Sequence, residues 1–482
     1  MTVLPFAFAQ RFGVLLQGNG LWVREDAPLT AIAEGLRLMP AGGALQVVNS
    51  ADFAARLAQC YQRGQSAAEQ MAQGLDGDLD LLRVAEALPR TADLLEQEGD
   101  APIIRLINAL LGQAVREKAS DVHLETFEHS LVVRLRIDGQ LREVLRPRRE
   151  LASLLVSRIK VMARLDIAER RLPQDGRMAL RLAGHEVDVR VSTLPSAHGE
   201  RVVLRLLDKQ AGHLDLAALG MASDTLARWH DVLARPHGIV LVTGPTGSGK
   251  TTSLYAALQQ LNDSTRNILT VEDPVEYHLP GIGQTPVNPR VDMTFARGLR
   301  AILRQDPDVV MVGEIRDAET AQVAVQASLT GHLVLSTLHT NSATSAVTRL
   351  LDMGVDAYLL ASSLTAVLAQ RLVRTLCPAC KVAYVAQPPE LARLALPPGS
   401  QQQLCRAHGC DDCLQGYRGR QGIYELLVMD TRLAALVHAG AAEGELLKVA
   451  RQAAPSLFDD GRRLVLAGQT SLDELLRVSR ED

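Results

Sequence analysis

The pattern of hydrophobic residues predicts a distinct domain over residues 101–209. Apolar residues recur three and four positions apart between 103 and 115, which is typical of an amphipathic helix. Strand-like runs follow, and Asp138-Gly139 separates two of them, a dipeptide that favours the tight turn of a β-hairpin. One helix followed by several hairpin-linked strands indicates an α+β domain.

The pattern changes after a connector at residues 210–220. The runs 238–243, 309–312 and 333–337 are short, continuous and rich in β-branched residues, which is typical of strands buried on both faces. Helical stretches separate these runs. The alternation predicts an α/β domain with a mainly parallel sheet over residues 221–376.

Both ends of the chain are less regular. Short apolar runs and Gly-rich turns predict a small N-terminal α/β module at 1–75, and an acidic stretch with several glycines predicts a linker at 76–100. A cysteine-containing segment covers 377–413, and we expect a mostly helical region at 414–482. No apolar run approaches the roughly 18 residues of a membrane-spanning helix. The first residues lack the features of a signal peptide, so we expect a cytoplasmic chain.

Charge is distributed unevenly around a formal net value of −4. Residues 1–100 carry 7 Arg and 13 Asp or Glu, whereas residues 101–210 carry 20 Lys or Arg and 14 Asp or Glu. This break near residue 100 predicts a change of function at the same point. The acidic total argues against a protein that binds polyanions over its whole length, so we expect no nucleic acid among its partners.

A glycine-rich loop follows the first buried strand and precedes a helical stretch. It fits G-x-x-x-x-G-K-[ST], in which backbone N–H groups surround phosphates, the lysine reaches the β- and γ-phosphates, and the last hydroxyl contacts Mg²⁺. A chance glycine-rich turn is the alternative, but strand, loop and helix are all in register. The predicted nucleotide and Mg²⁺ site consists of Gly244, Pro245, Thr246, Gly247, Ser248, Gly249, Lys250, Thr251 and Thr252.

Three further polar segments lie where a nucleotide hydrolase needs them. Glu314 follows the second buried strand and is a candidate ligand of Mg²⁺ or of its water, although it could instead cap the next helix. The three carboxylates that begin at Glu272 offer a base for the attacking water, Glu276 first, unless they form a solvated acidic turn. His332 and His339 flank the third strand, and we expect one of them, with His339 as the candidate, to contact the γ-phosphate.

Five of the six cysteines fall close together in the sequence. Cys377 and Cys380 form one Cys-x-x-Cys pair, and Cys410 and Cys413 form a second pair 29 residues further on. In a cytosolic chain, four thiolates in this arrangement are typical of a closed tetrahedral Zn²⁺ site rather than of disulfides. A redox dithiol or a nucleic-acid-binding ribbon would need sequence features that are missing here. We therefore predict a structural zinc site, with Cys405 outside it.

Taken together, these motifs resemble the four motifs of secretion ATPases, the hexameric motors of type II and type IV secretion and of type IV pili. The resemblance rests on the phosphate loop, the acidic box, the strand ending at Glu314 and the histidine-flanked strand. The runs 171–177 and 187–195 look like the type II and pilus-assembly branch, and residues 4–16 look like its type II secretion member.

This resemblance implies a RecA-like ATPase domain preceded by a PAS-like second domain. It also implies a ring of six chains, with ATP bound between the two domains. Arg190 and Arg205 of the second domain would then reach over the phosphates, although the sequence alone favours strand-surface positions for both. Arg300, Arg304 and Arg316 are further candidates for contacts between subunits.

The implied function is the export of proteins across the outer membrane by assembly of a pseudopilus at an inner-membrane platform. Residues 1–75 would dock on the cytoplasmic domain of a platform protein and so attach the ring peripherally to the membrane. The family's assembly ATPases also carry the four cysteines. Three alternatives stay open: a type IV pilus assembly ATPase, a RecA-like nucleic-acid motor, and a scaffold that binds ATP but scarcely hydrolyses it.

Overall fold

The computed structural model describes most of the chain after residue 100 and parts of the region before it. The described residues are 9, 12–17, 20–39, 43–50, 52–53, 56, 101–182, 185–208 and 216–479. The predicted linker at 76–100, Cys60 and most of the predicted connector lie outside them. Residues 1–113 with 180–186 form one compact unit, and residues 114–179 with 187–482 form another. Among the described residues, no helix combines the length and apolar character needed to cross a membrane.

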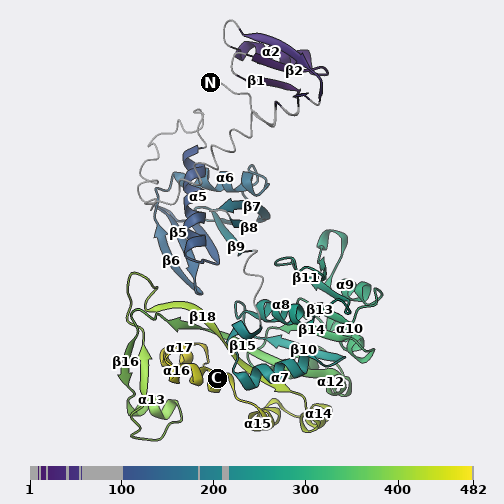
Figure 1. The fold of residues 1–482 in the computed structure, drawn as a ribbon, viewed down its shortest axis with the longest axis vertical. Coiled ribbons are helices and arrows are strands. Elements are labelled where there is room, and N and C mark those ends of the chain that lie inside the picture. Colours follow the sequence, from purple (N-terminus) through teal and green to yellow (C-terminus); the bar gives the residue numbers. More distant parts are fainter. Residues whose placement is uncertain are drawn as a thin grey trace. The chain divides into compact units, whose positions relative to one another are not determined.

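In the N-terminal module, the described residues include a three-stranded sheet and helix α2 (Figure 1). Its elements are β1 (Val14–Gln17), β2 (Gly20–Arg24), α2 (Leu29–Leu38) and β3 (Ala44–Val48). Strand β2 pairs antiparallel with β1 and parallel with β3, and α2 forms the crossover that a parallel pair requires. The small core contains Val14, Leu16, Leu21, Val23 and Ala31. The mixed α/β architecture agrees with the prediction for this region.

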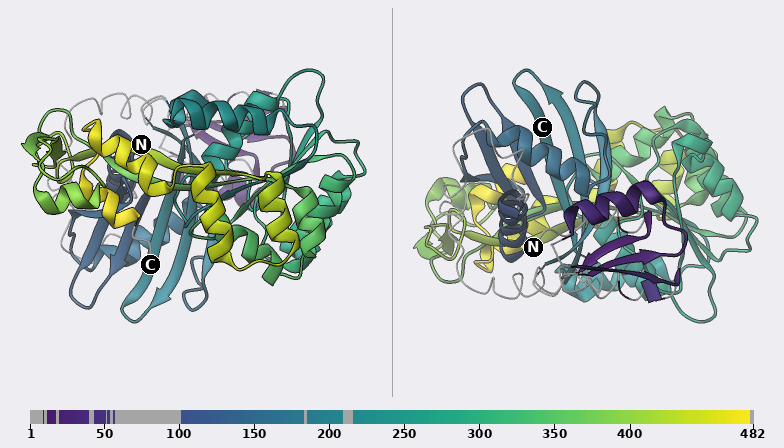
Figure 2. Two further views of the ribbon diagram at one scale, coloured as in Figure 1. Left: turned by 90° about the horizontal axis from the view of Figure 1, so that it is seen from below. Right: turned by 90° about the horizontal axis from the view of Figure 1, so that it is seen from above.

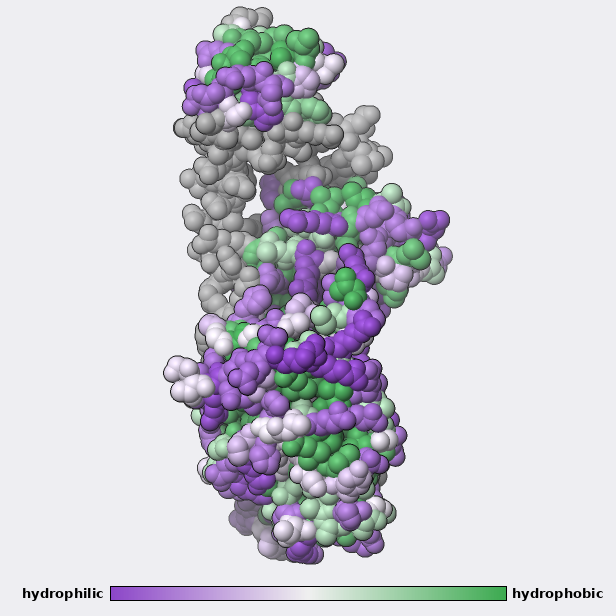
Figure 3. Space-filling model, turned by 90° about the vertical axis from the view of Figure 1, so that its right-hand side faces the viewer, coloured by the Kyte–Doolittle hydropathy of each residue, from purple (hydrophilic) through white to green (hydrophobic). Residues whose placement is uncertain are grey.

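This module also exposes large apolar side chains. Leu45 and Val47 are two positions apart on the edge strand β3 and therefore share a face, and both are exposed, as are Leu29 and Leu36 of α2. Apolar patches are visible on the module at the top of Figure 3. Exposed apolar patches of this kind commonly mark interaction surfaces.

The next region is a six-stranded antiparallel sheet with two helices. Its elements are α5 (Ala101–Arg116), β4 (Asp121–Thr126), β5 (Leu131–Ile137), β6 (Gln140–Leu145), α6 (Leu151–Met162), β7 (Gln174–Leu182), β8 (His185–Ser196) and β9 (Gly199–Asp208). The strand order is β6-β5-β4-β9-β8-β7, which agrees with the predicted α+β domain. The register places Asp121, Arg205 and Arg190 side by side on β4, β9 and β8.

A seven-stranded sheet with the order β12-β11-β13-β14-β10-β15-β18 forms the larger domain. All its pairings are parallel except that of β15 with β18. The mainly parallel sheet confirms the sequence prediction. Its elements are α7 (Ser223–Leu233), β10 (Gly238–Thr243), α8 (Lys250–Leu261), β11 (Ile268–Glu272), β12 (Gly283–Pro286), α9 (Phe295–Ile302), β13 (Val309–Val312), α10 (Ala318–Leu329), β14 (Leu333–Leu338), α11 (Ala343–Asp352), α12 (Ala357–Ser363), β15 (Leu364–Leu376) and β18 (Tyr417–Val428).

Alternating residues of strand β10 face two different hydrophobic cores. Ile239 and Leu241 pack with residues of α9, α10 and α11, whereas Val240 and Val242 pack with residues of α7 and α8. Helices therefore cover both faces of the sheet (Figure 2), which explains the continuous apolar runs in its strands.

Residues 377–416 form an insertion between β15 and β18. It contains β16 (Val382–Val385), α13 (Pro388–Arg393) and β17 (Gln403–Arg406), and the chain ends with α14 (Thr431–His438), α15 (Glu443–Ala453), α16 (Leu457–Leu466) and α17 (Leu472–Val478). The predicted helical region at 414–482 thus begins with a long strand. A short, mostly apolar run such as 423–428, interrupted by Glu425, does not distinguish a strand from a buried helix, which is why the sequence pattern missed β18.

Candidate functional site

The phosphate loop joins the buried strand β10 to helix α8. Gly249 precedes α8 with a φ of +86°, a left-handed conformation that glycine adopts without strain. Gly244 is restricted by space as well, because a Cβ atom there would lie 2.3 Å from the backbone oxygen of Gln370 on β15. The shape of the loop therefore depends on glycine at both positions.

Lys250 is buried at the start of α8. Its Nζ donates hydrogen bonds to the backbone oxygens of Gly244, at 2.8 Å, and Pro245, at 3.2 Å. Burial lowers the pKa of Lys250, and the negative charge of Glu314 opposes that shift. The loop therefore holds a partly desolvated cation, which attracts anions more strongly than an exposed lysine does.

Glu314 and His339 lie beside this lysine. His339 Nδ1 is 3.5 Å from Lys250 Nζ, and His339 Nε2 is 3.4 Å from Glu314 Oε2. Glu314 also pairs with Arg316, which we had expected at a subunit contact. The structure thus brings together three predicted site residues from the carboxyl ends of different strands, the edge at which parallel α/β sheets bind ligands.

His332 lies outside this group. Its Nδ1 is 2.9 Å from the backbone oxygen of Ala327, and it precedes β14 rather than following it. Arg300 and Arg304 also make contacts within the chain: Arg300 pairs with Glu319, and Arg304 donates to the backbone oxygen of Arg300. Nothing in these contacts points to catalysis.

The three carboxylates of the acidic box have different surroundings. Glu272 is 3% exposed and accepts hydrogen bonds from Tyr255, Thr270 and Gln284. Burial, together with the charge of Glu272, raises the pKa of Tyr255. Glu272 is thus fixed inside the domain, whereas Glu276 is partly exposed and remains a candidate base.

Glu276 contacts an arginine of the six-stranded sheet. Arg190 Nη2 lies 2.8 Å from Glu276 Oε2 and donates to the backbone oxygen of Val275 at 3.1 Å. Burial lowers the pKa of Arg190, an effect that Glu276 opposes. Arg205 lies next to Arg190 in the sheet, where its Nε donates to Asp121 Oδ1 at 2.9 Å. Both arginines line a cleft of about 480 Å³.

The loop offers groups that suit a phosphate and a cation. The hydroxyl of Ser248 is buried and has no hydrogen-bond partner among the described residues. Such a group is costly to leave unsatisfied and fits a phosphate oxygen. Thr251 is exposed at the start of α8, and its hydroxyl together with the Glu314 carboxylate supplies the oxygen ligands that Mg²⁺ prefers.

Sequence reasoning missed one buried contact of the loop. Gln370 is 2% exposed within β15, and its Nε2 donates to the backbone oxygen of Ser248 at 2.7 Å. The available signal was a single amide side chain directly after the apolar run 366–369. It is weak without knowledge that β15 lies beside β10.

The four predicted zinc ligands form a cluster. Their sulfur atoms all lie within 4.8 Å of one another. The separations are 3.9 Å for Cys377 and Cys410, 3.7 Å for Cys380 and Cys413, and 3.6 Å for Cys410 and Cys413. A tetrahedral site with Zn–S bonds of about 2.3 Å places sulfurs about 3.8 Å apart. The cluster therefore fits a zinc ion, and Cys405 lies outside it.

Backbone N–H groups support two of these thiols. The N–H of Gly409 donates to Cys380 Sγ, and the N–H of Cys410 donates to Cys413 Sγ, both at 3.3 Å. Such donors stabilise the thiolate form that binds a metal.

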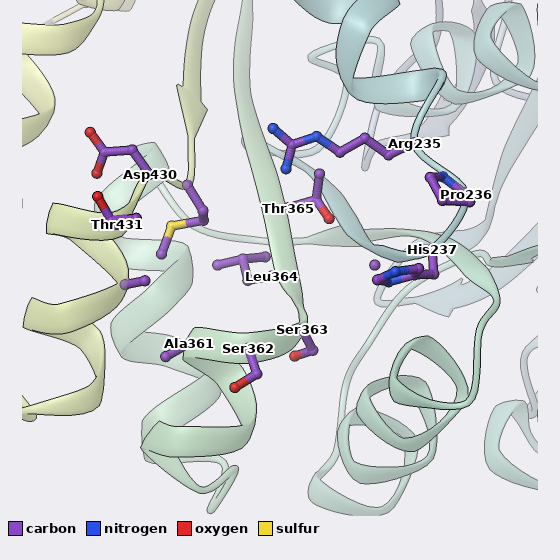
Figure 4. A pocket seen from close by; sticks show the side chains of 13 residues that line it. Arg235, Pro236, His237, Ala361, Ser362, Ser363, Leu364, Thr365, Asp430 and Thr431 are labelled. Atoms are coloured by element: carbon purple, nitrogen blue, oxygen red, sulfur yellow. The ribbon is translucent and has the colours of Figure 1, made fainter.

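A separate cavity of about 340 Å³ lies at the end of the seven-stranded sheet where strand β10 begins, opposite the end that carries the phosphate loop. Arg235, His237, Ser362, Thr365 and Asp430 are among its lining residues (Figure 4). The cavity surrounds Gly238, where β10 begins, whereas the phosphate loop follows the end of the same strand. It therefore does not belong to the nucleotide site.

Comparison with known proteins extends this description. Residues 96–477 match the family described as type II/IV secretion system protein, and residues 3–61 match a family that describes the N-terminal domain of GSPII protein E. The type II secretion system protein E of Pseudomonas aeruginosa is 63% identical over 484 residues, which cover 99% of this chain and 96% of that protein. The type II secretion system ATPase E of Vibrio cholerae is 58% identical over 486 residues, covering 99% and 97% respectively.

A solved structure has a similar fold. The pilus retraction motor PilT with bound ADP is 25% identical, has a TM-score of 0.53, and covers 78% of this chain and 97% of its own. The relatives named type II secretion system protein E favour a secretion ATPase over the pilus-assembly and nucleic-acid alternatives. The chain belongs to the type II/IV secretion system protein family, as an ATP-hydrolysing protein of its type II secretion branch.

Proposed function

We propose that the chain hydrolyses ATP at the phosphate loop with Mg²⁺ and uses the energy to assemble a pseudopilus at an inner-membrane platform. The observation that carries this proposal is the convergence of Lys250, Glu314 and His339 within 3.5 Å contacts beside the loop. A lysine that binds phosphates and a carboxylate that binds Mg²⁺ are groups that phosphoryl transfer uses, and the imidazole beside them can contact a phosphate oxygen.

Lys250 is the residue that binds the β- and γ-phosphates. It now donates to two carbonyl oxygens of its own loop, and it would exchange these neutral acceptors for charged phosphate oxygens, which form stronger hydrogen bonds. Backbone N–H groups of residues 244–251, with Thr252 just beyond, would complete the cradle at the helix N-terminus. His339, which lies 3.5 Å from Lys250, is the proposed contact of the terminal phosphate.

Thr251 and Glu314 are the residues that would hold Mg²⁺, directly or through water. The ion neutralises charge that develops on the phosphate oxygens during hydrolysis. Glu276 is the proposed base for the attacking water, and Arg190 and Arg205 are the proposed cations that stabilise the transition state. Because Arg190 pairs with Glu276, this contact has to open before either residue can act.

Cys377, Cys380, Cys410 and Cys413 are the proposed ligands of a structural Zn²⁺. The separations of their sulfur atoms support this assignment. The metal would fix the insertion at residues 377–416 and would take no part in hydrolysis.

Assembly and location complete the proposal. Six copies would form a ring in the cytoplasm, in which the cleft lined by Arg190 and Arg205 closes over nucleotide. The exposed leucines and valine of the N-terminal module, within residues 1–75, offer an apolar surface for the cytoplasmic domain of a platform protein. Attachment to the inner membrane would then be peripheral.

ATP turnover by the purified chain tests the catalytic part. We expect Glu314→Gln and Lys250→Ala each to lower turnover about 10²-fold or more, whereas a scaffold that only binds ATP would show little turnover to lose. Co-purification with inner-membrane proteins, with and without residues 1–75, tests the docking part. Retention of the same platform partner by the truncated chain would contradict it.

A further inference from the structure

Gln370 is a buried amide at the centre of the larger domain. It lies on β15, the strand beside β10, and the residues before it on β15, from Leu364 to Ala369, are all buried. A polar side chain in such surroundings is retained only if its amide group is fully hydrogen-bonded.

Both polar atoms of the Gln370 amide form hydrogen bonds, one with the phosphate loop and one with the helix that follows it. Nε2 donates to the backbone oxygen of Ser248, and Oε1 accepts from the hydroxyl of Ser253, each at 2.7 Å. The bond from Ser253 fixes the orientation of the amide, because a hydroxyl that donates to Oε1 leaves Nε2 facing Ser248. Gln370 therefore presents a donor, and not an acceptor, to the loop.

The loop is seated against this residue at two further points. A Cβ atom at Gly249 would lie 2.8 Å from Nε2 of Gln370, and one at Gly244 would lie 2.3 Å from the backbone oxygen of Gln370. Both distances are shorter than ordinary van der Waals contacts. Two glycines of the motif are thus needed where the loop approaches Gln370.

The bond to Ser248 also fixes the direction of a backbone donor. The carbonyl of Ser248 and the N–H of Gly249 belong to one planar trans peptide, in which the two groups point in opposite directions. Holding the carbonyl toward β15 therefore turns the Gly249 N–H away from it. In loops of this type, N–H groups aimed in this way bind phosphate oxygens.

We propose that Gln370 is a positioning residue that sets the phosphate loop in its binding shape before the nucleotide arrives. This inference rests on the proposed function, in which residues 244–251 bind ATP. Gln370 acts through the backbone and touches no reacting atom. Binding is tighter because the loop does not have to be ordered at the moment of binding.

The decisive variant is Gln370→Glu in the full chain. It keeps the acceptor for Ser253 and the size of the side chain, but it replaces the donor that faces Ser248 by a carboxylate oxygen. We expect the dissociation constant of a fluorescent ADP analogue to rise about tenfold or more, because two acceptors then face each other in a buried place. In steady state, KM for ATP should rise by a similar factor, while kcat changes less than about threefold.

Two further variants separate positioning from general stability. Gln421→Glu makes the same chemical change on the neighbouring strand β18, away from the loop, and should leave ADP affinity unchanged. Ser253→Ala removes the bond that orients the amide, together with a contact to Tyr424, and should weaken ADP binding by a smaller factor. If wild type binds ADP and Gln370→Glu binds it equally well, the positioning role is wrong while the proposed function stands. If wild type itself fails to bind ADP, both are wrong.

Discussion

We propose that the phosphate loop and the cysteine insertion each bind an ion, phosphate in the loop and Zn²⁺ in the insertion, but the protein supports the two segments in different ways. The loop lies between two strands of the central sheet, and Thr243 just before it bonds to the backbone of Leu338 and Thr340. The insertion contains a two-stranded sheet, β16 with β17, that pairs with no other strand among the described residues.

This difference indicates what holds each segment in shape. Strands β10 and β15 fix the phosphate loop, so the nucleotide finds a formed site. An isolated two-stranded sheet is only marginally stable, and Val385 on β16 is 57% exposed. Ala386, Leu391, Leu394 and Leu404 join the core, and the N–H of Cys377 donates to the backbone oxygen of Gly416 at 2.8 Å. The two Cys-x-x-Cys turns of the insertion meet at the four thiols. The fold therefore shapes the loop, whereas in the insertion we expect a metal at the four thiols to hold the two Cys-x-x-Cys turns together.

The largest effect is expected from loss of a cysteine ligand. Zinc binding contributes about 10–16 kcal/mol in small zinc peptides, so Cys410→Ser should release the metal and open residues 377–416 to proteolysis. ADP affinity should stay within about twofold of wild type, because the loop keeps its own support. Cys405→Ser is the matched control, since its thiol lies outside the cluster. Equal loss of zinc from both variants would contradict the assignment.

Lys250→Ala should have the next largest effect, on nucleotide binding and catalysis rather than on folding. ATP turnover should fall about 10²- to 10³-fold through loss of charge stabilisation. The melting temperature should not fall, because burial lowers the pKa of Lys250 and its charged form is therefore unfavourable in the free protein. Lys448→Ala, on the exposed face of α15, is the control for removal of a charge. A cooperative loss of folding in Lys250→Ala would show that the lysine supports the fold.

Effects of intermediate size are expected in the acidic box, Glu272 to Glu276, where the two glutamates should respond differently to substitution. Glu276→Gln should lower turnover about 10²-fold with ADP affinity kept, because a base is lost while the loop is intact. Glu272→Gln should instead lower the stability of the domain by about 1–3 kcal/mol, since its amide would face the hydroxyl and amide donors that now bond to the carboxylate. Turnover and thermal unfolding are measured on both variants. Loss of turnover in Glu272→Gln with stability kept, or loss of stability in Glu276→Gln with turnover kept, would contradict this assignment.

The smallest effect separates two glycines of the loop. Gly247 and Gly249 have similar φ values, +81° and +86°, so alanine strains the backbone at both positions by about 1 kcal/mol. Only at Gly249 does the added Cβ meet Gln370, whereas at Gly247 nothing lies within 4 Å. Gly249→Ala should therefore weaken ADP binding more than Gly247→Ala. If a calorimetric titration showed that both variants lose ADP affinity equally, the contact with Gln370 would not contribute to the shape of the loop.

Local patterns predicted the parts of this molecule in which sequence neighbours act together. The loop from Gly244 to Thr251 and the two Cys-x-x-Cys pairs each lie within a few residues, and continuous apolar runs identified β10, β13 and β14. Contacts between distant segments could not be predicted in this way. Gln370 reaches Ser248 across 122 positions, and Arg190 reaches Glu276 across 86, so both depend on which strands become neighbours. Strand β18 was missed because its apolar run fits a helix equally well.

Hydrogen–deuterium exchange of the full chain, with and without ADP and with and without a zinc chelator, tests the central claim most directly. We predict that ADP slows exchange in residues 244–251 whether or not the metal is present, and that the chelator speeds exchange only in residues 377–416. If removing the metal also abolished the protection of residues 244–251 by ADP, the metal and not the sheet would shape the nucleotide site, and the account would be wrong.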